Sequence, residues 1–358
     1  MPNQSTNILQ SQGVSLWLDN ITRKMLDDGT IQRYINELSV TGLTSNPTIF
    51  DNAITSSNDY DVAIKSSGDD ITDEALFFKL AVEDIQRAAD LFLPVYEKSN
   101  GQDGFVSIEV SPLLAFDTEK TIKAAKEIHG QVNRPNAFIK IPGTAEGLPA
   151  IEQAIAAGIP INITLLFTPE QYIAAAEAYL KGIETRIAKG LKADVRSVAS
   201  VFVSRWDKAV AGKISSPLEN TLGLAVMQKV FVAYQQFLNS PRVRTAMNFG
   251  AFPQRLLWAS TGTKDPAISD TRYIENLVAP FTVNTMPENT LLAFADHGKK
   301  SQTMQDDKGV ADNLLKQFLD AGVDYRQLGQ QLQNEGAASF DTSWEHLISS
   351  INTKRSAM

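Results

Sequence analysis

The sequence predicts an α/β protein of the (β/α)₈ class, a TIM barrel, with additional helices that are most evident at the C-terminus. Short apolar or alternating runs recur along the chain and are separated by segments with helical periodicity. Eight such runs fit within 358 residues, a length that suits one large barrel. No long linker rich in proline, glycine or serine divides the chain, so we expect a single domain over residues 1–358.

The predicted strands are rich in β-branched and aromatic residues and are bounded by proline, glycine or polar residues. Several are apolar on both faces, as expected for a parallel sheet that is covered by helices. They extend from about residue 14 to about residue 287. In chain order they are residues 14–19, 41–46, 105–111, 136–142, 161–167, 197–204, 255–261 and 281–287.

The predicted helices have apolar residues at helical spacing. Residues 169–190 begin after Thr168 with a proline and a glutamate, and end on a glycine, which are typical helix boundaries. The other helical segments are residues 21–38, 73–99 and 219–244, and those of the C-terminal part at about 288–354, chiefly 304–322 and 324–354.

An open, doubly wound sheet is the alternative architecture, because it is built from the same alternation of strands and helices. Such sheets bind dinucleotides through a glycine-rich turn after the first strand. The residues that follow the first predicted strand carry no such fingerprint, so the sequence favours the barrel.

The composition argues against several classes of function. A net charge of -8 does not suit a nucleic-acid surface, and three histidines are few for a histidine-liganded metal site or a histidine-based hydrolase. The absence of cysteine rules out disulfides and thiolate metal sites, which fits a reducing cytoplasm. Residues 1–12 are too polar for a signal peptide, and no apolar run approaches the ~20 residues of a membrane span. We therefore expect a cytoplasmic protein without nucleic-acid or membrane partners.

Polar or ionisable residues stand at the predicted carboxyl ends of nearly all strands, where barrel enzymes carry out their chemistry. Any one of them has an ordinary explanation, but their shared position predicts an active site. They are Asp19, Asn46, Glu109, Lys140, Asn162, Thr164, Ser200, Arg205, Ser260 and Lys264.

Lys140 is the most informative of these residues, because it stands between Ile139 and Ile141 in an apolar run. As an imine-forming nucleophile it would react as the free amine, a form that apolar surroundings favour. Alternatively, its ammonium extends to solvent or pairs with a carboxylate. Glu109, on the preceding strand, is a partner for Lys140 in either case.

Several of the other polar residues have an ordinary interpretation. Asp19 is a general acid/base or the N-cap of the next helix. Asn46 precedes a proline, which favours an ordinary turn, and Glu109 is flanked by apolar residues, so its carboxylate needs a partner if buried. Asn162 and Thr164 face the same side of a strand, either the barrel mouth or the outer surface.

Two features are candidates for binding phosphate. The guanidinium of Arg205 suits a phosphate at the barrel rim, or else forms a surface ion pair. Residues 258–266 offer small side chains, backbone N–H groups and Lys264, which is a weak signal for a phosphate nest.

Together these segments resemble the transaldolase family, in the longer form that carries extra helices on the barrel. The matching motifs cover most of the chain in the family's order and at comparable spacing. They are LWLDNITR, GLTSNPTIF, SIEVSP, FIKIPGT, INITLLF, VSRWDK and LLWASTGTKDP. The resemblance implies a class I Schiff-base mechanism that acts on sugar phosphates without a metal or an organic cofactor.

The resemblance also assigns roles to single residues. Lys140 matches the imine-forming lysine, and Asp19 matches the acid/base that moves the proton of the hydroxyl next to the broken carbon–carbon bond. Glu109 and Thr164 match the pair that positions a water during imine formation. The matches to substrate-binding groups are Asn46, Asn162, the hydroxyl-binding Ser200, the aromatic wall residue Phe202 and the phosphate-binding Arg205.

One motif departs from the family. Shorter relatives have Ser-Phe-Arg where this chain has Ser260, Thr261 and Gly262, so we expect Ser260 to keep its place and Lys264 to replace the missing arginine.

The implied reaction moves a dihydroxyacetone unit from fructose 6-phosphate or sedoheptulose 7-phosphate to erythrose 4-phosphate or glyceraldehyde 3-phosphate. The alternatives are a class I aldolase that releases free dihydroxyacetone and a non-catalytic sugar-phosphate-binding barrel. The C-terminal helices are amphipathic enough either to cover the barrel or to form a contact within a homo-oligomer.

Overall fold

The computed structural model describes residues 3–68, 70–214, 216–263, 265–305 and 309–357. Within these residues, eight parallel strands close into a barrel in chain order, and β8 pairs with β1. The fold is therefore the predicted (β/α)₈ barrel with additional helices. The strands are β1 (Val14–Asp19), β2 (Val40–Thr44), β3 (Val106–Glu109), β4 (Ala137–Pro142), β5 (Ile161–Leu166), β6 (Ser197–Phe202), β7 (Arg255–Ala259) and β8 (Thr282–Met286).

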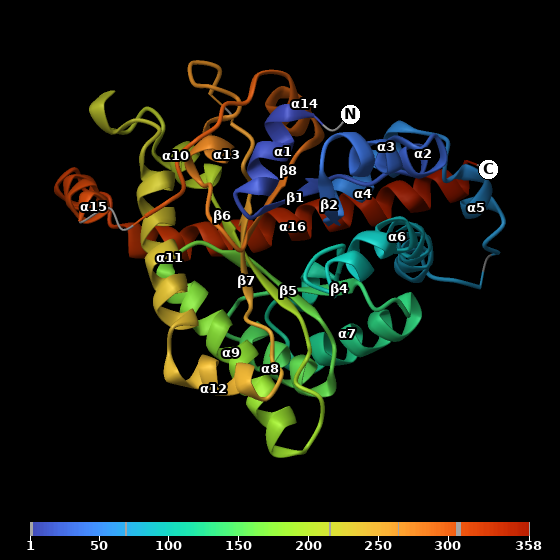
Figure 1. The fold of residues 1–358 in the computed structure, drawn as a ribbon. Coiled ribbons are helices and arrows are strands. Elements are labelled where there is room, and N and C mark those ends of the chain that lie inside the picture. The colour runs from blue at the N-terminus through green and yellow to red at the C-terminus, as the bar shows by residue number, and fades with distance from the viewer. Residues whose placement is uncertain (1–2, 69, 215, 264, 306–308, 358) are drawn as a thin grey trace.

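Helices surround the barrel and follow every strand (Figure 1). Those before β4 are α1 (Gln4–Ser11), α2 (Arg23–Asp27), α3 (Thr30–Glu37), α4 (Pro47–Ser56), α5 (Asp61–Lys65), α6 (Asp73–Lys98), η1 (Pro112–Leu114) and α7 (Thr118–Val132). Those between β4 and β8 are α8 (Gly147–Ala157), α9 (Pro169–Ala188), α10 (Ser204–Val210), η2 (Ser216–Leu218), α11 (Leu222–Leu238), α12 (Pro241–Asn248) and α13 (Arg272–Asn276). The C-terminal helices are α14 (Glu288–His297), α15 (Val310–Asp320) and α16 (Tyr325–Ser356).

Two segments that were predicted as single helices are each divided. Residues 21–38 form α2 and α3, because Gly29 adopts a left-handed conformation with φ 77° between them. Residues 219–244 form α11 and α12, and the break comes before Pro241, whose ring prevents a helix from continuing. In both cases the helical periodicity was correct and the interruption was missed.

The barrel interior is aromatic in one layer and polar in the next. Phe138 on β4 lies 6.2 Å from Trp17 on β1, between ring centroids, and stacks on Phe105 at 4.1 Å. Residues two apart on a strand face the same side. Lys140 and Asp19 therefore share the interior with these rings, one layer nearer the carboxyl ends of the strands.

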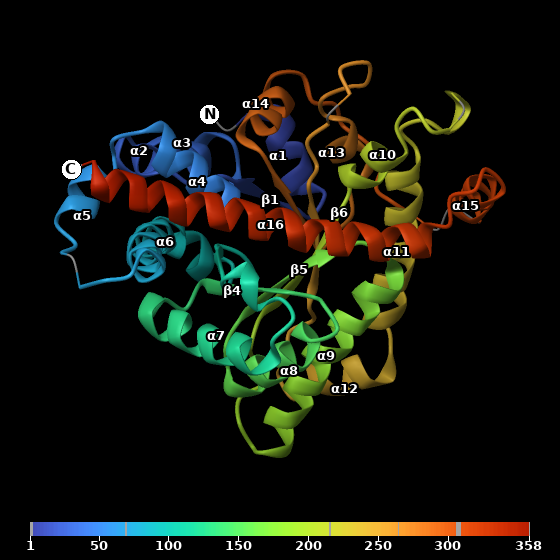
Figure 2. The ribbon, with the colours of Figure 1, turned by 180° about the vertical axis from the view of Figure 1, so that it is seen from behind.

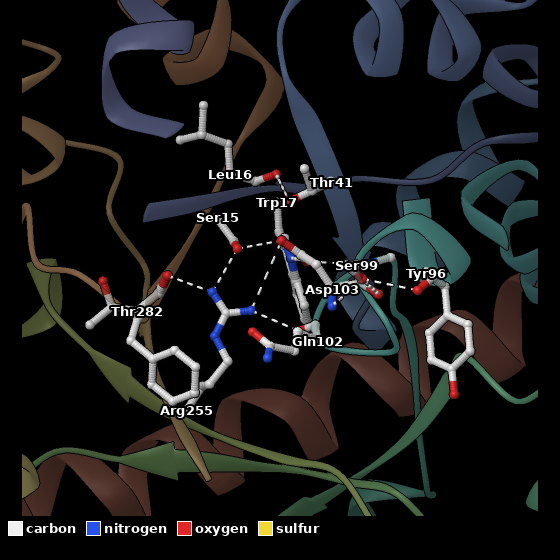
Figure 3. A network of polar contacts seen from close by, with 12 residues as sticks. Ser15, Leu16, Trp17, Thr41, Tyr96, Ser99, Gln102, Asp103, Arg255 and Thr282 are labelled. Carbon is white, nitrogen blue, oxygen red and sulfur yellow. Dashed lines mark hydrogen bonds and ion pairs between the residues drawn. The ribbon is translucent and has the colours of Figure 1, made fainter. Parts of the chain in front are cut away.

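A buried polar network closes the amino-terminal end of the barrel (Figure 3). Arg255, at the start of β7, donates hydrogen bonds to Ser15 Oγ at 2.6 Å and to the carbonyl oxygen of Thr282 at 2.9 Å. Its Nη1 lies 3.9 Å from Asp103 Oδ2, and Asp103 Oδ1 accepts a hydrogen bond of 2.8 Å from Trp17 Nε1. The network therefore fixes the Trp17 indole, which belongs to the aromatic layer.

Helix α16 crosses the barrel from the side of α11 to that of α5 in both views (Figures 1 and 2). Its buried Gln333 donates hydrogen bonds to the carbonyl oxygens of Gly143, at 3.0 Å, and Leu165, at 2.9 Å, which follow or end β4 and β5. Further along the helix, the Trp344 ring packs edge-on against Phe77 at 5.1 Å. Of the two roles considered for the C-terminal helices, α16 takes that of covering the barrel.

The packing of α8 against α9 predicts opposite effects for two glycine substitutions. A Cβ at Gly182 in α9 would lie 2.6 Å from Ile155 Cβ and 2.7 Å from the Glu152 carbonyl oxygen. We therefore expect Gly182→Ala to lower the free energy of unfolding by about 1–3 kcal/mol, the usual cost of overpacking. Thermal and urea denaturation followed by circular dichroism measure this change.

Gly130 is the matched control, because it is a helical glycine on the exposed face of α7 with no atom near the position of its Cβ. Gly130→Ala should raise stability by up to about 1 kcal/mol, since alanine is the better helix former. Equal stabilisation by both substitutions would contradict the close approach of α8 and α9.

Candidate active site

A cavity lies at the carboxyl ends of the strands, beneath α16. Residues predicted from the sequence line much of it: Asp19, Asn46, Lys140, Thr164, Ser200, Phe202, Arg205 and Ser260. Glu109 and Asn162 are buried in the adjoining barrel interior and are not part of the lining. Lys264, the expected replacement for the second arginine, lies outside the described residues.

Lys140 is buried and pairs with Glu109. The two residues stand opposite each other on β4 and β3, and Lys140 Nζ lies 3.1 Å from Glu109 Oε2. The ammonium also donates a hydrogen bond of 3.2 Å to the carbonyl oxygen of Ser45, just after β2. With 5% of its surface exposed, Lys140 does not extend to bulk solvent, so the pairing alternative is the one observed.

The two carboxyl groups near Lys140 are both perturbed by burial. Desolvation raises the pKa of Asp19, although the Lys140 charge and a 2.7 Å hydrogen bond from Thr44 Oγ1 act in the opposite direction. Desolvation likewise raises the pKa of Glu109, although the nearby charge of Lys140 acts to lower it. Carboxyl groups of this kind exchange protons nearer neutral pH than exposed ones do, as a general acid/base requires.

Asp19 is not the helix cap that was its alternative interpretation. The N-cap of α2 is Thr22, whose hydroxyl accepts a 3.1 Å hydrogen bond from the Met25 amide.

Asn46, in contrast, does cap a helix. Its Oδ1 accepts a 3.0 Å hydrogen bond from the Ile49 amide at the start of α4, where the proline had favoured an ordinary turn, and its side chain also lines the cavity. Its amide group retains N–H donors for a ligand.

Thr164 and Glu109 have polar atoms that could hold a water. Thr164 Oγ1 and Glu109 Oε1 are buried and accept or donate no hydrogen bond within the described residues. The β5–β6 register shifts between Ile163 and Leu166, and Leu165 has a left-handed φ of 59°. Strained backbone of this kind persists only where its surroundings hold it, which is common at functional sites.

Asn162 supports the cavity from within the barrel. Its Oδ1 accepts a 2.7 Å hydrogen bond from Ser200 Oγ, and its Nδ2 donates one of 3.1 Å to Ser107 Oγ. Asn162 and Thr164 therefore both face the barrel interior, as one of their two interpretations required. The direct contact of Asn162 is with Ser200, which does line the cavity.

Arg205 lies half-buried at the start of α10, between two aromatic rings. Its Cζ is 5.1 Å from the centroid of Phe202 and 5.9 Å from that of Phe340. No hydrogen bond or ion pair joins its guanidinium to any residue that the structure describes, and burial lowers its pKa. The surface ion pair is thus not observed, and an unpaired cation that lines a cavity suits an anionic group. Ser260 lies nearby in the lining, with its Oγ 2.9 Å from that of Ser204.

Two threonines and a phenylalanine are among the lining residues that were not singled out from the sequence. Thr44 and Thr285 share a 2.6 Å hydrogen bond between their hydroxyls, and Thr44 also contacts Asp19. The signal that the sequence offered for Thr44 and Thr285 was their position as polar residues near the ends of predicted strands. Phe340 comes from α16, where nothing in an amphipathic helix distinguishes a site residue from a core residue.

No cluster of three or more histidine or acidic side chains that could hold a metal ion occurs within the described residues. The cavity brings together the Lys140 amine, the Asp19 carboxyl group and the Arg205 cation, and the Glu109 carboxyl group lies directly behind Lys140 in the barrel interior. This combination suits covalent chemistry on a carbonyl compound that carries an anionic group.

Comparisons with known proteins agree with this chemistry. A family model described as Transaldolase/Fructose-6-phosphate aldolase matches residues 16–351. A transaldolase from Saccharopolyspora erythraea is 41% identical, over 98% of this chain and 97% of the relative. A transaldolase from Kocuria rhizophila is 40% identical over 97% of both chains, and a transaldolase 1 from Streptomyces coelicolor is 42% identical over 96% of this chain and 93% of the relative.

The buried pair predicts a pH-dependent loss of stability in Lys140→Met. Without the ammonium, the Glu109 carboxylate is buried without a counterion, which costs about 3–5 kcal/mol when one partner of a buried pair is removed. The pKa of Glu109 in the folded variant should then rise further. A carboxyl group whose pKa is raised by folding destabilises the protein progressively as pH rises from its unfolded pKa to its folded pKa, so the loss should be larger at pH 8 than at pH 5.

The free energy of unfolding of Lys140→Met, measured by urea denaturation between pH 5 and pH 8, tests this prediction. The double variant Lys140→Met/Glu109→Gln is the control, since it removes the charge and should recover stability at pH 8. A pH-independent loss in Lys140→Met would contradict the ion pair.

Proposed function

The chain belongs to the transaldolase/fructose-6-phosphate aldolase family, and from this membership we propose that it is a transaldolase, which moves a dihydroxyacetone unit between sugar phosphates. The observation that carries the proposal is the buried Lys140–Glu109 pair at 3.1 Å, in which Lys140 lines the same cavity as Asp19. The proposed donors are fructose 6-phosphate and sedoheptulose 7-phosphate. The proposed acceptors are erythrose 4-phosphate and glyceraldehyde 3-phosphate, which are sugars of the non-oxidative pentose phosphate pathway.

Imine formation starts from the Lys140–Glu109 pair. Because burial raises its pKa, Glu109 accepts the proton of the ammonium more readily than an exposed carboxylate would, and this leaves an amine that attacks the ketone carbon. The resulting carbinolamine loses its hydroxyl as water when Glu109 returns the proton. Thr164 Oγ1 and Glu109 Oε1 form no hydrogen bond with the described residues, so both are free to bind a water that relays this proton.

Cleavage follows because the protonated imine accepts the electron pair of a carbon–carbon bond. Asp19 takes the proton of the hydroxyl on the departing carbon, so the first aldose phosphate leaves with a new carbonyl group. The three-carbon unit stays on Lys140 as an enamine. Its carbon then attacks the acceptor aldehyde, Asp19 returns the proton, and hydrolysis of the imine releases the product. A raised pKa suits Asp19 to both directions of transfer.

The remaining cavity residues are proposed to hold the substrate. The half-buried Arg205 would bind the phosphate through charge-assisted hydrogen bonds, since none of the described residues forms a hydrogen bond or a close ion pair with its guanidinium. Asn46 and Ser200 would bind hydroxyl groups of the three-carbon unit, with Asn162 orienting Ser200. Ser260 lines the same cavity, and we also propose Lys264 as a second phosphate ligand.

None of the helices within the described residues is long and apolar enough to cross a membrane. We propose a cytoplasmic location, which the absence of cysteine supports.

Trapping of the imine tests the assignment of Lys140. The protein is incubated with fructose 6-phosphate, reduced with borohydride, digested and mapped by mass spectrometry. We expect one three-carbon adduct, on Lys140, because reduction fixes the imine as a stable secondary amine. An active preparation in which Lys140 stays unmodified would overturn the assignment, and the unreduced sample is the control.

The role of Asp19 is tested by separating imine formation from bond cleavage. We expect Asp19→Asn to keep borohydride trapping on Lys140, but to reduce turnover with fructose 6-phosphate and erythrose 4-phosphate by about 10²–10⁴-fold, the usual contribution of a positioned acid/base. Turnover is followed by coupled detection of glyceraldehyde 3-phosphate or sedoheptulose 7-phosphate. A variant that loses trapping and turnover together would contradict the proposed role.

A further inference from the structure

Phe340 lies over the two cations of the site, although it comes from a helix that is not part of the barrel. Its ring centroid is 5.7 Å from Lys140 Nζ and 5.9 Å from Arg205 Cζ. The residue lines the cavity and only 5% of its surface is exposed. Its ring is therefore the apolar cover on the α16 side of the reacting amine.

The position of this ring is fixed by contacts of α16 on both sides of it. Before Phe340, the Gln333 amide is bonded to the ends of β4 and β5, and Gly336 lies so near Arg205 that a Cβ would be 3.1 Å from its Nη1. After it, Trp344 packs against Phe77, and His346 Nδ1 lies 2.7 Å from Asp51 Oδ2. These contacts hold the part of α16 that carries Phe340 against the barrel on both sides of the ring.

Several polar side chains line the same cavity and would favour water there. Asp19, Thr44, Thr164 and Ser200 each present a hydrogen-bonding group to it. An aromatic ring presents no hydrogen-bonding group, so a water beside it lacks partners on that side. The cavity measures about 160 Å³, so the loss of one aromatic ring from its wall would change its size considerably.

We propose that Phe340 is a specificity-determining residue that keeps water away from the enamine held on Lys140, so that the enamine reacts with an acceptor aldehyde. The inference rests on the proposed function and adds to it the reason why transfer prevails over release.

Two fates are open to the enamine once the first aldose has left. In transfer, its carbon forms a bond to the acceptor carbonyl carbon, and Asp19 gives a proton to the new hydroxyl. In release, the same carbon takes a proton, derived from water, and a second water adds to the imine carbon. Collapse of that adduct frees dihydroxyacetone and the Lys140 amine. Only the second fate needs water next to the enamine before an acceptor has arrived.

The experiment compares Phe340→Ala and Phe340→Leu with the unmodified enzyme. With fructose 6-phosphate alone, the rate of free dihydroxyacetone release is measured. With erythrose 4-phosphate added, the rate of sedoheptulose 7-phosphate formation is measured. We expect Phe340→Ala to raise the ratio of release to transfer roughly tenfold, and Phe340→Leu to raise it less, because leucine keeps most of the apolar cover.

Trp344→Leu is the matched control, because it disturbs the seating of α16 one turn away and Trp344 does not line the cavity. It should lower the melting temperature and leave the ratio unchanged. A rise in the ratio as large as that of Phe340→Ala would assign the effect to the helix as a whole and overturn the proposal.

An unchanged ratio in Phe340→Ala, measured in an enzyme whose unmodified form transfers, would overturn the proposal for Phe340 alone. Absence of transfer in the unmodified enzyme would overturn the proposed function and this inference with it. The unmodified enzyme thus reports on the function, and the variants report on Phe340.

Discussion

The buried pair of Lys140 and Glu109 is the constraint to which the surrounding barrel is adapted. A buried ion pair is favourable only where its geometry is good and its remaining hydrogen-bonding groups are met. Here the parallel register places the two residues side by side, and the Ser45 carbonyl oxygen accepts a hydrogen bond from the ammonium, while Glu109 Oε1 stays without a partner among the described residues. In the aromatic layer below the pair, Phe138, two residues before Lys140, stacks on Phe105 and fills the barrel interior.

The barrel and most of the cavity lining were predictable because both follow from local patterns. A parallel strand that is buried on both faces is an apolar run, so all eight strands were located. A polar residue at the end of such a run, such as Lys140 or Asp19, is expected to face the barrel mouth unless it caps the next helix or pairs with another residue. The breaks at Gly29 and before Pro241 were missed because helical spacing continues across them.

Phe340 could not have been predicted in the same way. Its partners, Lys140 and Arg205, are remote in sequence, and in an amphipathic helix a phenylalanine looks the same whether it packs on a core or on a cavity. The position of Asn162 relative to the lining also depends on tertiary structure. The irregular backbone at Leu165 and the bonds to Ser107 and Ser200 decide it, and alternation along the strand gives only its side.

The path of α16 gives the site a particular order of assembly. All eight strands precede this helix in the chain, so during synthesis the amine, both carboxyl groups and Arg205 leave the ribosome before Phe340 does. Since domains tend to fold as their residues become available, a barrel can close around Lys140 while its mouth is still uncovered. The docking of the last helix is then the step that turns a reactive pocket into a sheltered one.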